Sequence, residues 1–298
     1  MFGPNVIPAY HHRSDKFHTL YESTEKLFRR QFSIGPDFDL IFMTGSGALA
    51  LEACIASLNY PLRVEHTGGK FGKRLEAVSN HYKEWLPLHG DDPLGLVFYE
   101  TSNSTLSAIS LDKLEAARVV LMDCVSSFPF YPIHEQADIW VTVTGKQLRC
   151  PAGLAIIGVR KTLWGSYLTK DPDHPSYLNL SRYHEFSLRY ETPTTPSILG
   201  FESLHEKLEF TIFESQKLII QRRWEELCQL CGTPPGQSPP VYTFPGLVTD
   251  VHKAFGLYGS DQTQVFLYAG IEQQFQALMK ALAVQRSVDP DATYWWHK

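Results

Sequence analysis

The feature that most constrains the fold is an alternation of strand-like and helical stretches through the first two thirds of the chain. Between the first two strand-like runs, Gly47 to Leu58 is apolar nearly all round, as in a helix packed inside a domain. Such alternation is typical of an α/β domain in which helices cover both faces of a mostly parallel sheet. Strands are expected at 40–43, 94–100, 119–125, 139–144 and 154–159.

The last third of the chain has a different pattern, which predicts a smaller second domain. One long helix is expected from about 197 to 231, where a Gly-Thr-Pro-Pro-Gly segment would end it. A short strand at 264–268 and a helix from 270 to about 286 follow. The predicted organisation is a large α/β domain at 1–232, with an N-terminal arm at 1–20 and a long connecting helix at 197–231, and a small α+β domain at 233–298.

Composition and charge exclude several classes of protein. With 43% hydrophobic residues among 298, the chain has enough apolar side chains for a globular core, which excludes general disorder. Its net charge of −5 gives no electrostatic footprint for nucleic acid or an anionic membrane. No stretch approaches the roughly 18 apolar residues of a membrane span, and the first residues lack the features of a signal peptide. We therefore expect a soluble, cytoplasmic protein.

Thr44-Gly45-Ser46-Gly47 lies between a predicted strand and a predicted helix and is a candidate anion site. The free backbone N–H groups and the dipole at a helix N-terminus favour a phosphate there. A tight turn with a serine cap explains the same residues equally well. The spacing matches neither the dinucleotide fingerprint nor the P-loop.

Two charged residues each follow an apolar strand. Asp123 ends one predicted strand, and Lys146 follows another. Open α/β sheets bind ligands at the carboxyl ends of their strands, and a buried charge requires a partner. Asp123 alone is explained somewhat better by capping of the next turn, but an acid, an amine and an anion loop at one sheet edge indicate a ligand site.

Pyridoxal phosphate is a cofactor that uses all three groups. It forms a Schiff base with a lysine, holds its ring nitrogen protonated against a carboxylate, and binds its phosphate on backbone amides. Burial of Lys146 would lower its pKa and favour the nucleophilic free amine. The three groups together therefore indicate a pyridoxal phosphate site.

The order of the motifs resembles that of the class V aminotransferases, a group of fold-type-I pyridoxal-phosphate enzymes that includes serine-pyruvate and alanine-glyoxylate aminotransferases. The resemblance covers about residues 1–210 and implies the fold-type-I fold, the cofactor and transfer of an amino group. The matching segments are Gly3-Pro4, His12-Arg13-Ser14, 44–53, 69–74, 100–102, 123–127, 138–146, 151–153 and 192–196.

The resemblance also implies roles for individual residues. Lys146 falls on the Schiff-base lysine and Asp123 on the partner of the ring nitrogen. The other implied cofactor contacts are Ser46, Gly47 and Ala48 at the phosphate, Phe71 and Val125 on the two ring faces, Thr101 near the ring hydroxyl, Thr144 beside the lysine, and Thr194 and Thr195 from the neighbouring subunit of a homodimer. Without the resemblance, Phe71 is better explained as a core aromatic and Thr101 as a strand-end hydroxyl.

Two departures from the family pattern bear on the substrate. Thr144-Gly145 stands where the family usually has Ser-Gln, so a side-chain contact to the phosphate is expected to be lost. Leu267 stands where the family has an arginine for the substrate α-carboxylate, and a leucine cannot make that bidentate contact. Candidate replacement cations are Arg13, Arg149 and Arg189, although a surface or structural role explains each of them better.

These observations favour a pyridoxal-phosphate-dependent aminotransferase with an unusual amine or amino acid substrate and a keto acceptor. A decarboxylase or lyase with the same cofactor is the second hypothesis, including one that acts on an amino group carried by a large molecule such as a modified nucleobase. A non-catalytic relative of the fold is the third, and the presence of Lys146 and Asp123 argues against it. No metal is expected, since the single Cys228-x-x-Cys231 pair lacks further ligands.

Overall fold

The chain forms two compact units in the computed structural model. They are Met1–Ser102 with Ala108–Thr211, and Asn103–Ser107 with Ile212–Lys298. The domain boundary predicted after residue 232 lies further along the chain. The residues that the structure describes are 10–59, 62–65, 70–83, 96–100, 119–168, 176–231, 241–243, 264–268 and 272–288.

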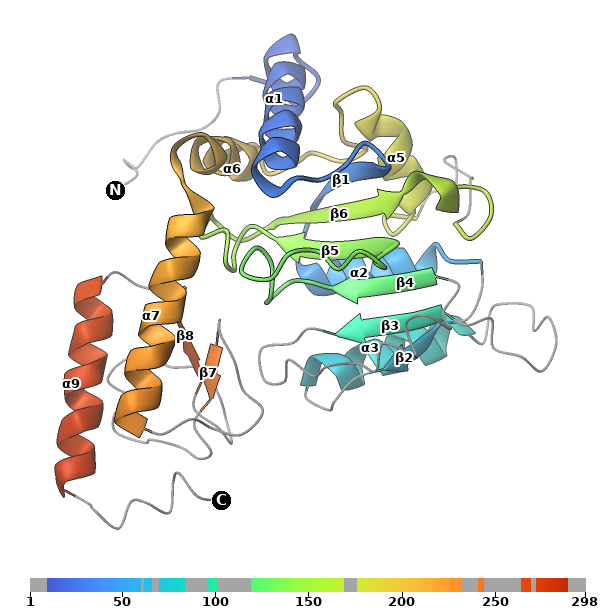
Figure 1. Cartoon of the computed structure of the whole chain (residues 1–298). Coiled ribbons are helices and arrows are strands. Elements are labelled where there is room, and N and C mark those ends of the chain that lie inside the picture. Colours follow the sequence, from blue (N-terminus) through green and yellow to red (C-terminus); the bar gives the residue numbers. More distant parts are fainter. Residues whose placement is uncertain are drawn as a thin grey trace. The chain divides into compact units, whose positions relative to one another are not determined.

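The first unit is built on a six-stranded sheet with the strand order β1-β6-β5-β4-β3-β2 (Figure 1). Strand β6 is antiparallel to both of its neighbours, β1 and β5, whereas the other three pairs of strands are parallel. The prediction of a mostly parallel sheet is therefore confirmed, and all five predicted strands are present. The strands are β1 Phe38–Thr44, β2 Arg63–Glu65, β3 Leu96–Glu100, β4 Val119–Asp123, β5 Ile139–Val143 and β6 Leu154–Arg160.

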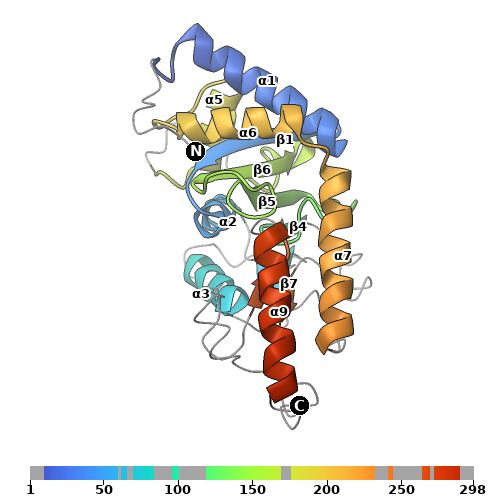
Figure 2. The ribbon, with the colours of Figure 1, turned by 90° about the vertical axis from the view of Figure 1, so that its left-hand side faces the viewer.

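Helices cover both faces of this sheet, as predicted. Figures 1 and 2 show α2 and α3 together on one face, where Ile41 and Met43 of β1 belong to the same buried cluster as Leu51 of α2. On the opposite face, the ring of Phe42 lies 5.1 Å from those of Tyr21 in α1 and Phe201 in α6. Successive residues of a strand point to opposite faces, so a sheet that is covered on both sides needs a continuous apolar run. The helices of this unit are α1 Asp15–Phe32, α2 Gly47–Ala56, α3 Lys70–Lys83, the 3₁₀ turn η1 Lys161–Leu163, α5 Leu180–Ser187 and α6 Ile198–Phe210.

Helix α1 corrects the prediction of an N-terminal arm at 1–20, because residues 15–20 are helical. Ser14 is the N-cap, and its side chain accepts a hydrogen bond from the backbone N–H of Phe17. Asp15 in the first turn is favourable at the positive end of the helix dipole. A serine followed by an aspartate was a helix-start signal that the sequence prediction did not use.

The prediction of one long helix from 197 to 231 is wrong, because α6 ends at Phe210 and α7 Phe213–Cys231 begins anew. Thr211 between them is extended, with φ −106° and ψ 129°. Its carbonyl accepts a hydrogen bond of 2.7 Å from the side chain of Gln31 in α1. The break therefore combines a β-branched residue, which has a weak helix propensity, with a tertiary contact that fixes the extended conformation.

The second unit contains α7, the antiparallel pair β7 Val241–Thr243 and β8 Gln264–Phe266, and α9 Glu272–Val288. Helices α7 and α9 are joined by an ion pair of 2.6 Å between Arg222 and Glu272. Leu267, which follows β8, is fully buried, and its carbonyl accepts a hydrogen bond of 2.8 Å from the guanidinium of Arg223. A leucine at position 267 therefore fits the apolar interior of this unit.

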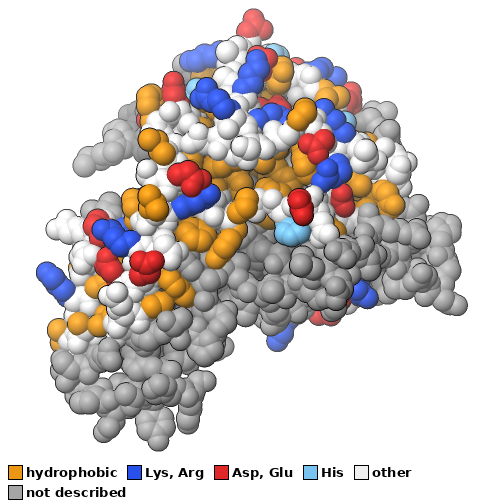
Figure 3. All heavy atoms as spheres, in the orientation of Figure 1, with side chains coloured by type: hydrophobic (Ala, Val, Ile, Leu, Met, Phe, Trp, Pro, Cys, Tyr) orange, Lys and Arg blue, Asp and Glu red, His pale blue; other side chains and the backbone are white. Residues whose placement is uncertain are grey.

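On the face that Figure 3 shows, the basic and acidic side chains of the described residues are interspersed, and neither charge forms a large patch. None of the helices in the described part of the chain has the length and apolarity needed to cross a membrane.

Candidate active site

The sheet topology brings three loops to one edge. Strands β1 and β5 are both antiparallel to β6, and β4 is parallel to β5, so the carboxyl ends of β1, β4 and β5 lie together. The amino end of β6 lies at the same edge. Residues placed just after β1, β4 and β5 therefore converge, at the edge where open α/β sheets bind ligands.

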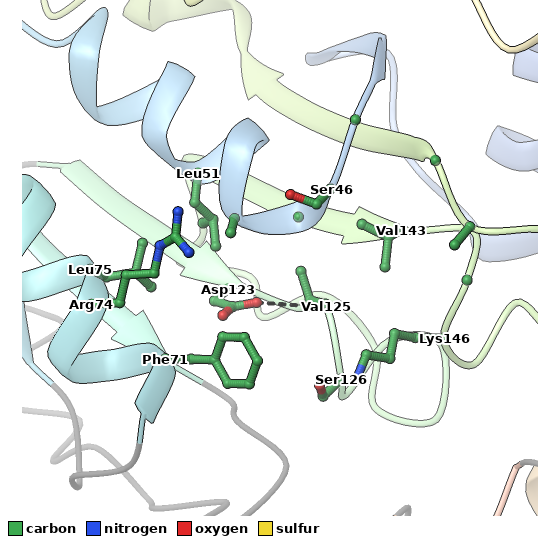
Figure 4. A pocket seen from close by; sticks show the side chains of 16 residues that line it. Ser46, Leu51, Phe71, Arg74, Leu75, Asp123, Val125, Ser126, Val143 and Lys146 are labelled. Carbon is green, nitrogen blue, oxygen red and sulfur yellow. Dashed lines mark hydrogen bonds between the residues drawn. The ribbon is translucent and has the colours of Figure 1, made fainter. Parts of the chain in front are cut away.

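A cavity of about 300 Å³ lies at this edge (Figure 4). Most of its wall is apolar, and the charged side chains among its lining residues are Arg74, Asp123 and Lys146. The described residues that line it are Gly45, Ser46, Gly47, Ala48, Leu51, Phe71, Arg74, Leu75, Asp123, Val125, Ser126, Val143, Gly145, Lys146, Ala152 and Gly153.

The loop between β1 and α2 forms one wall of the cavity. Gly45 has φ 149°, in the region that favours glycine, and its N–H donates a hydrogen bond of 2.9 Å to the carbonyl of Gly153. Ser46 is the N-cap of α2, and its hydroxyl accepts from the N–H of Leu49 at 3.2 Å. Ser46 therefore caps the helix, as one of the two explanations of this loop required. The free end of α2 still faces the cavity with its positive dipole, as an anion site requires.

Close packing explains the glycine at position 47. A Cβ atom built there would lie 2.5 Å from Cγ2 of Val125 and 3.2 Å from Cγ1 of Val143. We expect Gly47→Ala to destabilise the protein by about 1–3 kcal/mol, as overpacking of a core does. Urea unfolding measures this loss, and adding Val125→Ala should recover part of it. Strictly additive effects of the two substitutions would contradict the packing explanation.

Asp123 ends β4 and is almost fully buried, with 6% of its surface exposed. Its Oδ1 accepts a hydrogen bond of 2.9 Å from the N–H of Val125, which fixes the carboxylate at the cavity wall (Figure 4). A carboxylate held in this way can bind a cationic or N–H-bearing group of a ligand in the cavity.

Lys146 follows β5 and points into the same cavity (Figure 4). Burial lowers the pKa of its amine below the usual value for lysine, and the nearby Asp123 carboxylate partly opposes this shift. A larger share of the amine is therefore neutral and nucleophilic near neutral pH. Gly145 before it has no room for a side chain, since a Cβ would lie 2.7 Å from that of Ala152.

Phe71 and Val125 both line the cavity next to Asp123 (Figure 4). Phe71 is in the first turn of α3, and 42% of its surface is exposed, which is unusual for a core phenylalanine. The alternative explanation of Phe71 as a core aromatic therefore does not fit its exposure. An apolar slot with an aromatic wall suits a flat, unsaturated ring.

Of the predicted site residues, the structure brings together Ser46, Gly47, Ala48, Phe71, Asp123, Val125 and Lys146. Thr144 is not with them. It is fully buried, and its hydroxyl donates hydrogen bonds to the carbonyls of Pro151 at 2.7 Å and Leu154 at 3.2 Å. These two carbonyls engage the only proton that the hydroxyl can donate, which gives Thr144 a structural role in this loop; its predicted cofactor contact stays a prediction.

The remaining predicted contacts lie elsewhere. Thr194 and Thr195 are in the loop before α6 and do not line the cavity of their own subunit. The carbonyl of Thr194 accepts a hydrogen bond of 2.7 Å from the hydroxyl of Thr192, and Thr195 is exposed. Thr101 lies outside the described residues.

Nine of the lining residues were not predicted as site residues, and the two of them with polar side chains, Arg74 and Ser126, fall inside the motifs. Arg74 and Leu75 lie three and four residues after Phe71 in α3, a spacing that places all three on one face of the helix. This periodicity was the available signal for Arg74. Ser126 lies one residue after Val125, and its approach to Lys146 depends on a loop conformation that the sequence pattern does not reveal.

The three arginines proposed as replacement cations do not line the cavity. Arg13 lies 3.9 Å from the carboxylate of Glu191, and Arg189 lies 3.3 Å from that of Glu185. Arg149 is exposed and has a positive φ of 56° in the turn after the lysine. Among the described residues, Arg74 is therefore the arginine that lines the cavity and could bind an anionic group there.

Comparison with known proteins gives relatives of low sequence identity. No model of a protein family matches the chain. A soluble hydrogenase 42 kDa subunit of Anabaena cylindrica is 26% identical over 179 residues, which are 58% of this chain and 44% of that protein. An uncharacterized aminotransferase of Methanocaldococcus jannaschii is 27% identical over 253 residues, 73% of this chain and 64% of that protein. The chain thus matches less than two thirds of the length of either relative.

Solved structures define the fold more firmly. An aspartate aminotransferase of subgroup IV from Thermus thermophilus superposes with a TM-score of 0.75 at 19% identity, over 96% of this chain and 94% of that one. A phosphoserine aminotransferase from Trichomonas vaginalis with bound PLP gives 0.67 at 11% identity, over 92% and 90% of the two chains. The fold is therefore that of the fold-type-I aminotransferases, and the prediction of fold class is confirmed.

Proposed function

We propose that this protein is a pyridoxal-phosphate-dependent aminotransferase whose cofactor binds in the cavity between Phe71 and Val125. The observation that carries the proposal is the convergence of Lys146, Asp123 and the N-terminus of α2 on one cavity. An amine, a buried carboxylate and an anion site around an apolar slot are the groups that this cofactor requires. The aminotransferases among the proteins compared above support the same class of reaction.

The residues around the cavity fit the cofactor in shape as well as in charge. Glycine at position 47 lets Val125 and Val143 pack closely against the start of α2, and the N-terminus of this helix lines the cavity, where its N–H groups could bind a phosphate. Phe71 and Val125 would cover the two faces of the ring. Asp123 would accept a hydrogen bond from the ring nitrogen, and Lys146 would provide the covalent link.

When bound, pyridoxal phosphate supplies an electron sink for the carbon that carries the amino group. The carboxylate of Asp123 keeps the proton on the ring nitrogen, which maintains that sink. With the cofactor bound, the amine of Lys146 would act as the base, taking a proton from the substrate carbon at its Nζ and delivering it to the acceptor carbon. Its lowered pKa keeps this nitrogen available as a base.

The substrate is proposed to be an amine or amino acid that does not rely on the family's carboxylate-binding arginine. Leu267 at that arginine's position in the motif is buried and apolar. Among the described residues that line the cavity, Arg74 is the arginine, and its guanidinium could bind an anionic group of the substrate or of the cofactor. A keto acceptor completes the reaction.

A decarboxylase or lyase reaction with the same cofactor is not favoured. The two solved structures and the archaeal relative compared above are all called aminotransferases. A non-catalytic role is not favoured either, since a scaffold has no use for a lysine of lowered pKa beside a buried carboxylate. A cytoplasmic homodimer remains part of the proposal. Its basis is the resemblance of the Thr194-Thr195-Pro196 loop to one that reaches the cofactor phosphate from the neighbouring subunit.

Reconstitution of the purified protein with pyridoxal phosphate tests the proposal. We expect a visible absorption band from the lysine-linked cofactor, and conversion of an amino donor to its keto product together with the aminated cofactor. Amines and L-amino acids should be offered separately, because rapid reaction with alanine or serine would contradict the inference from Leu267. Release of carbon dioxide with recovery of the original cofactor would instead support the decarboxylase hypothesis, and a protein that binds no cofactor would refute both.

A further inference from the structure

The residue after Lys146 links the lysine loop to the loop that follows β4. Gln147 is 2% exposed, so both polar atoms of its amide need partners inside the protein. Its Nε2 donates a hydrogen bond to the carbonyl of Ser126, and its Oε1 accepts one of 3.0 Å from the N–H of Phe130. A single side chain thus holds both ends of the segment 126–130.

This contact determines where Ser126 lies. Ser126 is 8% exposed and lines the cavity, and Figure 4 shows the amine end of Lys146 directed toward it. Because Gln147 bonds the backbone carbonyl of Ser126, it fixes the position of Ser126 in the cavity wall relative to Lys146. The charged groups that face this amine across the cavity are Asp123 at the end of β4 and Arg74 on α3.

We propose that Ser126 and Gln147 are positioning residues for Lys146. The hydroxyl oxygen of Ser126 accepts a hydrogen bond from the protonated amine and holds it at the reacting end of the cavity. Gln147 acts through Ser126 by fixing its backbone. This inference rests on the proposed function for the role of the amine, but the contact itself can be tested without a cofactor.

The first measurement is the pKa of Lys146 in the cofactor-free protein. Competitive labelling with acetic anhydride over a range of pH, with the lysine peptide quantified by mass spectrometry, reports the neutral amine. An acceptor stabilises the ammonium, so its removal in Ser126→Ala should lower the pKa of Lys146 further, by about one unit. Ser126→Thr, which keeps the hydroxyl, should restore the native value, and Gln147→Leu should shift it in the same direction as Ser126→Ala.

Ser181→Ala is a matched control, because Ser181 is also buried, at 5% exposure, but does not line the cavity. It should leave the pKa of Lys146 unchanged. Circular dichroism and thermal unfolding identify any variant that fails to fold. For a folded Ser126→Ala protein, an unchanged or raised pKa of Lys146 would overturn the proposal.

The second measurement uses the protein loaded with pyridoxal phosphate. Ser126→Ala should lower kcat on the order of 10-fold to 100-fold, with little change in the KM of the amino donor, because the contact acts on the proton-transferring group. An effect on KM or on cofactor affinity alone would indicate a role in packing and would count against the inference. If the wild type binds no cofactor while the labelling result holds, the proposed function fails and the contact between Ser126 and Lys146 stands.

Discussion

Lys146→Ala is expected to abolish the visible absorption band that pyridoxal phosphate gives on binding to the protein. In the proposed function, this amine forms the covalent link and moves the substrate proton, and the variant lacks it. Turnover should fall on the order of 10²–10⁴-fold or more, the range observed when a positioned acid-base group is removed. Absorption spectra and product formation under saturating cofactor measure the two losses.

Lys207→Ala is the matched control for this substitution. Burial also lowers the pKa of Lys207, with a contribution from Arg149, but its side chain does not line the cavity. The control should retain both the band and the activity. An equal loss in the two variants, or a band that survives in Lys146→Ala, would show that Lys146 is not the attachment point.

Asp123→Asn is expected to weaken cofactor binding about 10-fold to 100-fold. The substitution preserves the shape of the side chain, and its amide oxygen can still accept the hydrogen bond from the N–H of Val125, so the fold should be retained. In the proposed site it would remove a charge-assisted hydrogen bond to the ring nitrogen, worth about 1.5–3 kcal/mol, and each 1.4 kcal/mol corresponds to tenfold in affinity. Titration of the cofactor-free protein with pyridoxal phosphate measures the change.

Two further results would confirm that the charge is responsible. The carboxylate of Asp123 raises the pKa of Lys146, so its loss should lower that pKa in the labelling experiment. Asp138→Asn removes another partly buried carboxylate, one that accepts from the N–H of Val120 and from Arg160 outside the cavity. It should affect stability but leave cofactor affinity intact. Equal binding by Asp123→Asn and the wild type would remove Asp123 from the proposed site.

The parts of the fold that could be predicted from the sequence are those set by local pattern. Strands that are covered on both faces are continuous apolar runs, and each of the five predicted strands was found where such a run occurs. Strand ends then placed Asp123, Lys146 and the loop before α2 at one edge without any knowledge of side-chain contacts. The break in the predicted helix at Thr211 could not be found in this way, because it depends on Gln31, which is 180 residues away in the sequence.

The unpredicted parts of the candidate site depend on the path of loops. Thr144 turns away from the cavity because the chain returns toward β6 and places two carbonyls next to its hydroxyl. Gln147 looks like an ordinary polar residue after a strand, and its burial follows from the position of the segment 126–130. These contacts join loops from different strands, so no periodicity in the sequence encodes them.

The antiparallel strand β6 has a consequence for the length of the ligand. Because β6 lies between β1 and β5, the anion loop after β1 and the lysine loop after β5 are separated by two strand intervals, about 10 Å. The N–H of Gly45, bonded to Gly153 at the start of β6, fixes one end of this span. Under the proposed function, this separation would favour an elongated ligand with an anion near the loop after β1 and an electrophilic carbon near Lys146.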